Sequence, residues 1–282
     1  MMVSYKQALQ QAETRATALG YEASRATWLM LDLFEWSRTD LLRYQDEAMT
    51  TKHAAQYDDA VVRMLSGEPI EYITGVQSFY GLTFEVTPDT LIPRPETEEV
   101  MLHFSKMLSP QARIADVGTG TGAIAITLKS MMPQLEVYAT DLYTETLNVA
   151  RRNASKHDVA LTFLEGDLLT PFMQQQITLE GLISNPPYID VADKAFMEKT
   201  VLDYEPHHAL FAASEGYALY ARMIQQLPYV MCDGAPVVFE IGHNQGETLK
   251  EMVTSCHPQC HVDVLRDING HARIVSFIWR EK

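Results

Sequence analysis

The stretch Ile114–Ala125, IADVGTGTGAIA, decides the fold that this sequence predicts. An apolar run leads into Gly118, Gly120 and Gly122, and apolar residues at helical spacing follow. Glycine lets the backbone turn sharply and lets a ligand approach main-chain atoms. We therefore predict a strand, a glycine-rich turn and the start of a helix. By itself such a turn is weak evidence for a ligand, since Gly118, Gly120 and Ala123 fit the dinucleotide pattern only loosely.

Strands and helices alternate on both sides of this stretch. We expect helices at 122–132, 145–156, 217–231 and 245–255, and strands at 112–117, 136–141, 161–166, 180–184, 235–241, 261–266 and 273–279. Such alternation predicts a parallel sheet with helices on both faces. Asp267–Gly270 is too short for a parallel crossover, and its Asn-Gly pair favours a hairpin. The fold class is thus α/β and Rossmann-like, with a mostly parallel seven-stranded sheet and an antiparallel last strand.

The N-terminal part of the chain has a different pattern. Residues 1–74 place apolar residues at helical spacing and contain no polar cluster that suggests catalysis, so we expect a small helical domain. Its helices are expected to be capped by Ser4, Ser24 and Thr39. Residues 75–93 are expected to form a β-hairpin linker, and residues 94–282 the α/β domain.

Composition and charge restrict the compartment and the partners. The chain has 282 residues, of which 46% are hydrophobic, as in soluble globular proteins. No apolar run approaches the roughly 20 residues of a membrane span, and the N-terminus lacks a signal-peptide core. We expect a cytoplasmic protein without membrane contact. The net charge of -15 disfavours a duplex nucleic-acid footprint and permits a basic protein partner.

Cysteine usage argues against a disulfide scaffold and a metal site. The chain has 3 cysteines, a number typical of a protein from a reducing compartment. Cys256 and Cys260 lie near His257 and His261, but no second cysteine pair completes the closed ligand set of a structural zinc site. We therefore predict no metal.

Acidic residues follow the second and third predicted strands. Asp141 can accept hydrogen bonds from both hydroxyls of a ribose, or it can cap the helix that follows. Asp167 can accept from an adenine amino group with Leu168 against the ring, or the pair can form a polar turn. Together with the glycine-rich turn, these residues predict a ribose-containing cofactor. They do not distinguish a nicotinamide dinucleotide from S-adenosylmethionine.

The sequence Asn185-Pro186-Pro187-Tyr188 leaves the fourth predicted strand, beside the first. Open α/β sheets bind their ligands at this edge. An amide or aromatic amine nitrogen is a poor nucleophile because its lone pair is delocalised. Carbonyl oxygens of Asn185 and Pro186 can accept its two N–H hydrogens, while Pro187 fixes the angle and Tyr188 offers a face for stacking. This is catalysis by positioning, without a general base.

That chemistry selects the cofactor. A hydride-transfer enzyme has no use for such a pocket, whereas an N-methyltransferase has, so we predict S-adenosylmethionine. If Asn185 acts only as an acceptor, its replacement by aspartate should preserve part of the activity.

Further stretches resemble one family of class I S-adenosylmethionine-dependent methyltransferases. With Gly118–Gly122 and Asn185–Tyr188, they make the chain similar to the release factor glutamine methyltransferases along nearly its whole length. These stretches are Gly67–Gly75, Leu91–Glu98, Tyr204–Pro206 with Ala209 and Leu210, and Glu240–Gly242 with Gln245 and Gly246.

The resemblance implies methylation of the glutamine side-chain amide in the Gly-Gly-Gln motif of peptide chain release factors. It implies that Gly118, Thr119, Gly120, Thr121, Gly122 and Asp141 hold the cofactor, together with Asp167 and Leu168 at the adenine and with Asn185. Asn185, Pro186, Pro187 and Tyr188 would hold the glutamine. The helical domain would dock the release factor, and we expect a monomer.

Three alternatives are weighed against this interpretation. A ribosomal-protein glutamine methyltransferase would use the same chemistry with a different docking surface. A DNA adenine N6-methyltransferase shares the four-residue pocket but needs basic surface and a target-recognition region. A cofactor-binding module without activity would have no need of an intact Asn185–Tyr188.

Overall fold

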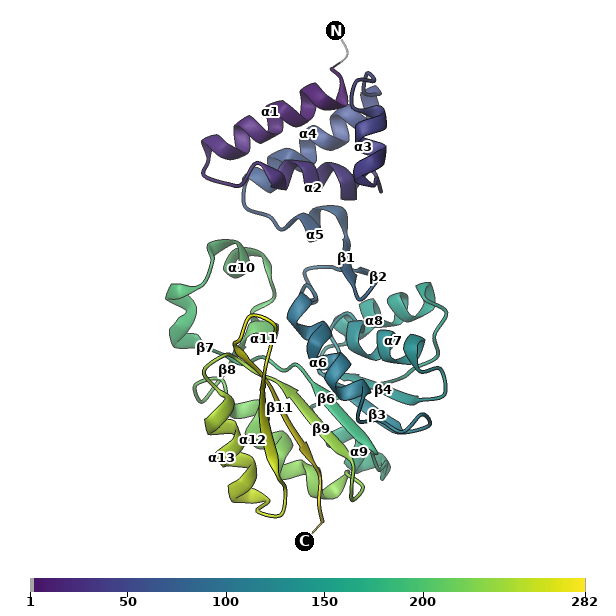
Figure 1. Ribbon diagram of the computed structural model, residues 1–282, viewed down its shortest axis with the longest axis vertical. Helices are drawn as coiled ribbons and strands as arrows, with labels where there is room; N and C mark the ends of the chain where they lie inside the picture. Colours follow the sequence, from purple (N-terminus) through teal and green to yellow (C-terminus); the bar gives the residue numbers. More distant parts are fainter. Residues whose placement is uncertain (1–2, 282) are drawn as a thin grey trace. The chain divides into compact units, whose positions relative to one another are not determined.

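The structure is a computed structural model that describes residues 3–281. The chain separates into two compact units (Figure 1). The first contains the described residues up to Val76 together with Glu198–Tyr204. The second contains Gln77–Met197 and the described residues from Glu205 onward. Residues 198–204 therefore lie between two segments of the second unit along the chain, but they belong to the first unit.

The first unit is helical. Its core consists of buried apolar side chains such as Tyr5, Leu29, Met30, Tyr57 and Met64. Its helices are α1 (Tyr5–Ala18), α2 (Ser24–Leu33), α3 (Arg38–Tyr44), α4 (Thr51–Leu65), α5 (Ile70–Thr74) and α10 (Lys199–Tyr204). The expected helical domain is present. It also contains α10, which the pattern of residues 1–74 could not predict because α10 comes from a later part of the chain.

The cap predicted at Ser4 is confirmed. Its hydroxyl oxygen accepts a hydrogen bond from the backbone N–H of Gln7 at 3.3 Å, at the start of α1. The cap predicted at Ser24 is wrong. Ala23 is the N-cap of α2, and Ser24 lies inside the helix with its hydroxyl turned to Glu22.

The cap predicted at Thr39 is also wrong, because a stronger cap precedes it. Ser37 accepts from the backbone N–H of Asp40 at 3.1 Å, and the Asp40 carboxylate accepts from the backbone N–H of Ser37 at 2.9 Å. This reciprocal pair starts α3 at Arg38. Similarly, Thr50 caps α4, whose first residue is Thr51.

A two-stranded hairpin opens the second part of the chain, as expected for residues 75–93. It consists of β1 (Val76–Phe79) and β2 (Leu82–Glu85). Tyr80 and Gly81 connect the strands with φ of 46° and 77°. Two positive φ values in a two-residue loop match the right-handed twist of a hairpin.

The predicted seven-stranded sheet is confirmed, with the order β10-β11-β9-β6-β3-β4-β5. The last strand, β11, is antiparallel to both its neighbours, whereas β9, β6, β3, β4 and β5 pair in parallel. The strands are β3 (Arg113–Val117), β4 (Glu136–Asp141), β5 (Thr162–Glu165), β6 (Gly181–Ser184), β9 (Pro236–Glu240), β10 (Val262–Arg266) and β11 (Ala272–Ile278).

Helices cover both faces of this sheet, on opposite sides in Figure 1. Alternate side chains of one strand enter different cores: Ala115 and Val117 pack in one, and Ile114 in the other. The Ile114 face is covered by α6 (Pro95–Ser105), α7 (Ala123–Met131) and α8 (Thr144–Lys156). The opposite face is covered by α9 (Thr170–Gln175), α12 (Ala218–Gln226), η2 (Leu227–Tyr229) and α13 (Gly246–Cys256).

The remaining elements follow β6. They are β7 (Ile189–Asp190), η1 (Val191–Phe196), α11 (His207–Leu210) and β8 (Phe211–Ala212), with β7 paired to β8 in parallel. No helix within residues 3–281 is long and apolar enough to cross a membrane.

The strand order places the two predicted sites next to each other. Val117 is the register partner of Ser184, so Gly118 and Asn185 leave neighbouring parallel strands at the same edge. Open α/β sheets bind ligands outside the carboxyl ends of their strands, where the strand order reverses. Here the chain runs from β3 outward to β5 and returns to β6 on the other side of β3.

Candidate functional site

A cavity of about 490 Å³ lies at this edge of the sheet, within the second unit. Its volume falls in the range of about 300–1,000 Å³ that is usual for small-molecule sites. The predicted residues that line it are Gly118, Thr119, Gly120, Thr121, Asp141, Asp167, Leu168, Asn185, Pro186 and Pro187. Gly122 and Tyr188 are not among the residues that line it.

The glycine-rich turn leaves space on the cavity side. Gly118 and Gly120 have φ of 74° and 56°, values that favour glycine, and a Cβ atom at either would meet no atom within 4 Å. Gly122 differs, because a Cβ atom there would lie 2.8 Å from Cδ1 of Ile126. The first two glycines thus leave room for a ligand, and the third permits the close start of α7.

Asp141 closes the turn from the neighbouring strand. Its Oδ2 accepts from the backbone N–H of Gly120 at 3.1 Å, and its Oδ1 accepts from that of Tyr143 at 3.2 Å. Burial raises the pKa of this carboxyl group. The N-cap of α8 is Tyr143, so Asp141 is not the capping residue. Backbone N–H donors on the turn and after β4 thus orient the carboxylate at the cavity wall.

A second carboxylate lies beneath the turn and was not singled out from the sequence. Asp116 is fully buried, and its Oδ2 accepts from the Thr119 hydroxyl at 2.6 Å and the Ala125 backbone N–H at 3.3 Å. Burial raises the pKa of Asp116 to about 7. The signal was present in the sequence: an acidic residue inside an otherwise apolar strand needs a partner to be buried.

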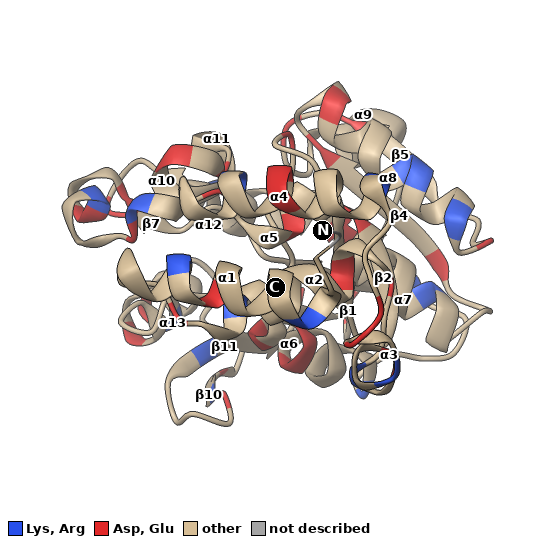
Figure 2. Ribbon diagram, turned by 90° about the horizontal axis from the view of Figure 1, so that it is seen from above, with Lys and Arg blue, Asp and Glu red and all other residues tan. Residues whose placement is uncertain are grey.

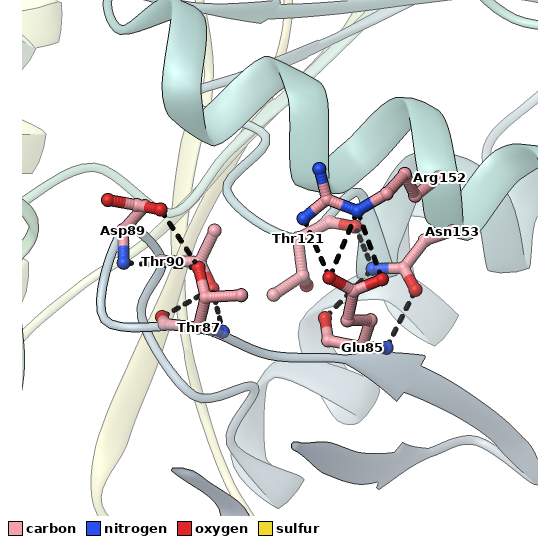
Figure 3. Close-up of polar contacts among 7 residues, drawn as sticks. All are labelled: Glu85, Thr87, Asp89, Thr90, Thr121, Arg152 and Asn153. Atoms are coloured by element: carbon pink, nitrogen blue, oxygen red, sulfur yellow. Dashed lines mark hydrogen bonds and ion pairs between the residues drawn. The ribbon is translucent and has the colours of Figure 1, made fainter.

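A side-chain amide fastens the turn to the hairpin (Figure 3). Asn153 of α8 donates to the backbone carbonyl oxygens of Thr121 and Glu85, each at 3.0 Å, and accepts from the backbone N–H of Glu85 at 2.7 Å. Arg152 forms an ion pair with the Glu85 carboxylate at 2.6 Å. The wall of the cavity therefore draws on α8 as well as on the turn.

Asp167 and Leu168 reach the cavity from the end of β5. The Asp167 carboxylate forms an ion pair with Arg222 of α12, which also lines the cavity. Leu168 adopts φ of 51°, an uncommon value for a residue other than glycine. Arg222 was not predicted, because nothing in the sequence marks a contact between residues of two distant elements. The adenine contacts of Asp167 and Leu168 stay predictions.

Asn185 is held by a side chain from α6. Its Nδ2 donates to Oγ1 of Thr97 at 3.3 Å, and the Thr97 hydroxyl donates to Oε2 of Glu240 at 2.6 Å. Thr97 is 5% exposed and Glu240 is 1% exposed. The bond from Nδ2 to Thr97 is the one hydrogen bond that the Asn185 side chain makes within residues 3–281. Oδ1 of Asn185 therefore stays available at the cavity wall.

Tyr188 is held through its backbone. Its carbonyl oxygen accepts from Nε2 of Gln245 at 2.9 Å, and a Cβ atom at Gly216 would lie only 2.0 Å from that oxygen. Tyr188 borders a second cavity, of about 400 Å³, together with Asp190 and His243. Burial raises the pKa of Tyr188 to about 12. The stacking face expected of Tyr188 stays a prediction.

Two of the motifs quoted from the sequence meet in one ion pair. Arg94, which lines the main cavity, contacts the Glu205 carboxylate at 2.5 Å. The Glu205 side chain is 2% exposed and also accepts from the backbone N–H of Ile92 at 3.5 Å. The buried Glu205 carboxylate thus connects the segment before α6 to the segment before α11 through charge-assisted hydrogen bonds.

The residues present fit S-adenosylmethionine. The open glycines provide a surface for close approach, the oriented Asp141 carboxylate suits a ribose, and the cavity has sufficient volume. Within residues 3–281 no group of three His, Cys, Asp or Glu side chains could hold a metal ion.

Comparisons with known proteins identify relatives along nearly the whole chain. Models of the PrmC N-terminal domain and of the methyltransferase small domain match residues 7–75 and 97–204. The chain is 52% identical to the release factor glutamine methyltransferase of Staphylococcus aureus, over 99% of this chain and 100% of that protein. It is 35% identical to that of Bacillus anthracis, over 95% and 97%. A methyltransferase structure from Pyrococcus furiosus is similar in fold, with a TM-score of 0.55, 16% identity and coverage of 79% and 100%.

Proposed function

Since the chain belongs to the release factor glutamine methyltransferase family, we propose that it methylates the glutamine side-chain amide in the Gly-Gly-Gln motif of peptide chain release factors. The methyl donor is S-adenosylmethionine. The observation that carries the proposal is Asn185, whose Nδ2 is engaged by Thr97 while its Oδ1 is available at the cavity.

Asn185 and Pro186 orient the glutamine amide. Oδ1 of Asn185 accepts one N–H of the substrate, and the carbonyl oxygen of Pro186 accepts the other. With both hydrogens held, the nitrogen lone pair is directed at the methyl donor. Aligned acceptors of this kind reduce the barrier by positioning and by preorganised electrostatics.

The rest of the cavity binds the donor. Gly118, Gly120 and Asp141 would hold it, with Asp167 and Leu168 at the adenine. When bound there, S-adenosylmethionine would supply an electrophilic methyl group to the nitrogen that Asn185 and Pro186 hold. Asn185 and Pro186 keep the nitrogen in place while it loses one proton to water, so no basic side chain is required.

Mass spectrometry tests this proposal directly. A purified release factor is incubated with the protein and isotopically labelled cofactor, then digested and sequenced. We expect one labelled methyl group on the glutamine of the Gly-Gly-Gln motif. A label on another residue, on ribosomal protein or on adenine of added DNA would reject release factor glutamine as the substrate.

We further propose that residues 1–74 dock the release factor, that 75–93 act as a linker and that 94–282 form the catalytic domain. The match of residues 7–75 to a separate domain model supports this division. Truncation is a poor test of it, because Ser66 contacts Tyr204 at 3.3 Å and α10 would lose its packing partners.

A surface substitution avoids that problem. Trp28 is 47% exposed on the helical unit, with Arg38 over its ring at 4.9 Å. We expect Trp28→Asp to raise KM for a whole release factor and to leave turnover of a short Gly-Gly-Gln peptide unchanged. Tyr229→Asp, at an exposed aromatic of the second unit, is the control. Equal KM values for Trp28→Asp and the wild type would reject docking at this surface.

We also propose that the protein acts as a cytoplasmic monomer that makes no direct contact with nucleic acid. The net charge of -15 supports the last point. Lys and Arg residues are spread over elements of both units in the view of Figure 2.

A further inference from the structure

Two of the quoted motifs have so far been given no role in holding the cofactor or the glutamine. Thr97 lies in Leu91–Glu98, and Glu240 begins Glu240–Gly242. They are 143 residues apart in sequence, yet the Thr97 hydroxyl contacts the Glu240 carboxylate at 2.6 Å. The same hydroxyl accepts from Asn185, 88 residues away from Thr97. Both motifs therefore meet behind the residue that we assign to the substrate amide.

The direction of these hydrogen bonds follows from counting hydrogens. A threonine hydroxyl has a single hydrogen to donate, and an ionised carboxylate can only accept. The hydrogen of Thr97 therefore goes to Glu240, and Thr97 can only accept from Asn185. The Asn185 side chain must then turn its NH₂ group to Thr97, which leaves Oδ1 as the atom presented to the cavity.

We propose that Thr97 and Glu240 are positioning residues that select which end of the Asn185 amide faces the substrate. This proposal rests on the proposed function, since it concerns the acceptor for the glutamine N–H. The oxygen and NH₂ ends of the Asn185 amide are nearly equal in shape, so without the pair neither orientation would be preferred. The NH₂ group could then point at the substrate nitrogen and repel its hydrogens.

The charged and titratable groups around Glu240 make the orientation of the Asn185 amide depend on pH. Arg273 of β11 and Arg94 favour the charged form, Glu96 opposes it, and the hydroxyl groups of Tyr188 and Tyr220 lie nearby. Burial outweighs the two arginines and raises the pKa of Glu240 to about 7. A protonated Glu240 can donate to Thr97, which frees the Thr97 hydrogen for Oδ1 of Asn185. The amide orientation should therefore be lost as the pH falls through about 7.

Threonine variants test the pair. Thr97→Val removes the hydroxyl and preserves the shape, while Thr97→Ser preserves the hydroxyl. The matched control is Thr127→Val, because Thr127 is 1% exposed and its hydroxyl has no partner within the described residues. Single-turnover methyl transfer is measured at pH 8 with saturating cofactor and release factor, alongside cofactor affinity and thermal unfolding.

We expect Thr97→Val to slow transfer about ten- to a hundredfold, as for a misplaced catalytic group, with cofactor affinity unchanged. Thr97→Ser and Thr127→Val should transfer at the wild-type rate. In an Asn185→Ala background, Thr97→Val should cause no further loss, because its effect passes through Asn185. Wild-type transfer by Thr97→Val, or a full additional loss in the Asn185→Ala background, overturns the inference.

Glu240→Gln provides the pH measurement. The wild-type rate should fall between pH 8 and pH 6, and the variant should show a flatter profile, because its side chain does not titrate. Identical profiles would overturn the link between Glu240 and Asn185. Failure of the proposed function itself is distinguishable, because then the wild-type protein would transfer no methyl group to release factor glutamine at any pH.

Discussion

The glycine-rich turn and the Asn185–Tyr188 turn leave neighbouring strands of one sheet, but they are built in different ways. The first takes its conformation mainly from its own residues, since positive φ at Gly118 and Gly120 favours glycine, and its distant partners Asp141 and Asn153 bind its backbone. The second is held from outside. Thr97 orients the Asn185 side chain, and Gln245 binds the Tyr188 carbonyl oxygen.

This difference indicates which substitutions each turn should be sensitive to. The cofactor site should respond to changes within a few residues of the turn and at Asp141. The substrate site should also respond to changes far away in sequence, because its geometry depends on Thr97 of α6 and on Gln245, which follows β9. The following experiments separate the two.

The largest expected effect is at Asn185. Asn185→Ala should reduce single-turnover transfer about a hundred- to a thousandfold, as for loss of one oriented polar group, with cofactor affinity near wild type. The structure changes the expectation for Asn185→Asp. Aspartate lacks the N–H that Thr97 accepts, and it adds charge near Glu240. It should be as poor as alanine, and partial retention would show that the donor is dispensable.

The next effect concerns the cofactor alone. Asp141→Ala should weaken S-adenosylmethionine binding by about 1.5–3 kcal/mol, the range for hydrogen bonds to a charged group. Calorimetry measures this on protein whose folding is checked by circular dichroism. Thr97→Val is the comparison, because it should leave the affinity unchanged. An unaltered affinity in folded Asp141→Ala would remove Asp141 from the cofactor site.

Each turn has a buried carboxyl beneath it, Asp116 or Glu240, and burial raises the pKa of both to about 7. Between their ordinary pKa values and 7, the folded state binds more protons than the unfolded state. Stability should therefore fall as pH rises through this window, by up to about 1.4 kcal/mol per pH unit for each group.

Asp116→Asn and Glu240→Gln should each flatten this dependence. Denaturant unfolding of the ligand-free protein at pH 5, 6 and 7 gives the slopes, and the Thr127→Val variant should have the wild-type slope. A variant slope equal to that of the wild type would show that the corresponding carboxyl does not titrate in this range.

The smallest expected effect concerns alanine at two glycines, and it separates the cost of backbone strain from the obstruction of the cofactor cavity by a side chain. Gly118 and Gly81 have φ of 74° and 77°, and a Cβ atom at either would meet nothing within 4 Å. Alanine should therefore cost a similar stability at both, about 1 kcal/mol. Only Gly118→Ala should also weaken cofactor binding, by a few-fold, because Gly118 lines the cavity. Equal cofactor affinities for the two variants would contradict the assignment.

Much of the fold follows from local signals in the sequence. Apolar runs and their spacing predicted the strands, and the Asn-Gly pair at Asn269 and Gly270 predicted the antiparallel last strand. Local signals also compete, which explains the wrong caps. Thr39 is a plausible cap in isolation, but Ser37 forms a capping box with Asp40 and starts the helix earlier.

The sequence by itself determined that a glycine-rich turn, an acidic strand end and an Asn-Pro-Pro-Tyr turn would share one edge of a sheet. This follows because parallel strands end at the same edge. Only the tertiary structure decided which end of the Asn185 amide faces the cavity. That choice depends on Thr97 and Glu240, which lie 88 and 55 residues from Asn185 along the chain and meet only when α6 packs beside β6 and β9. Hydrogen-bond direction depends on which atoms touch, and contacts between distant side chains leave no periodic signal.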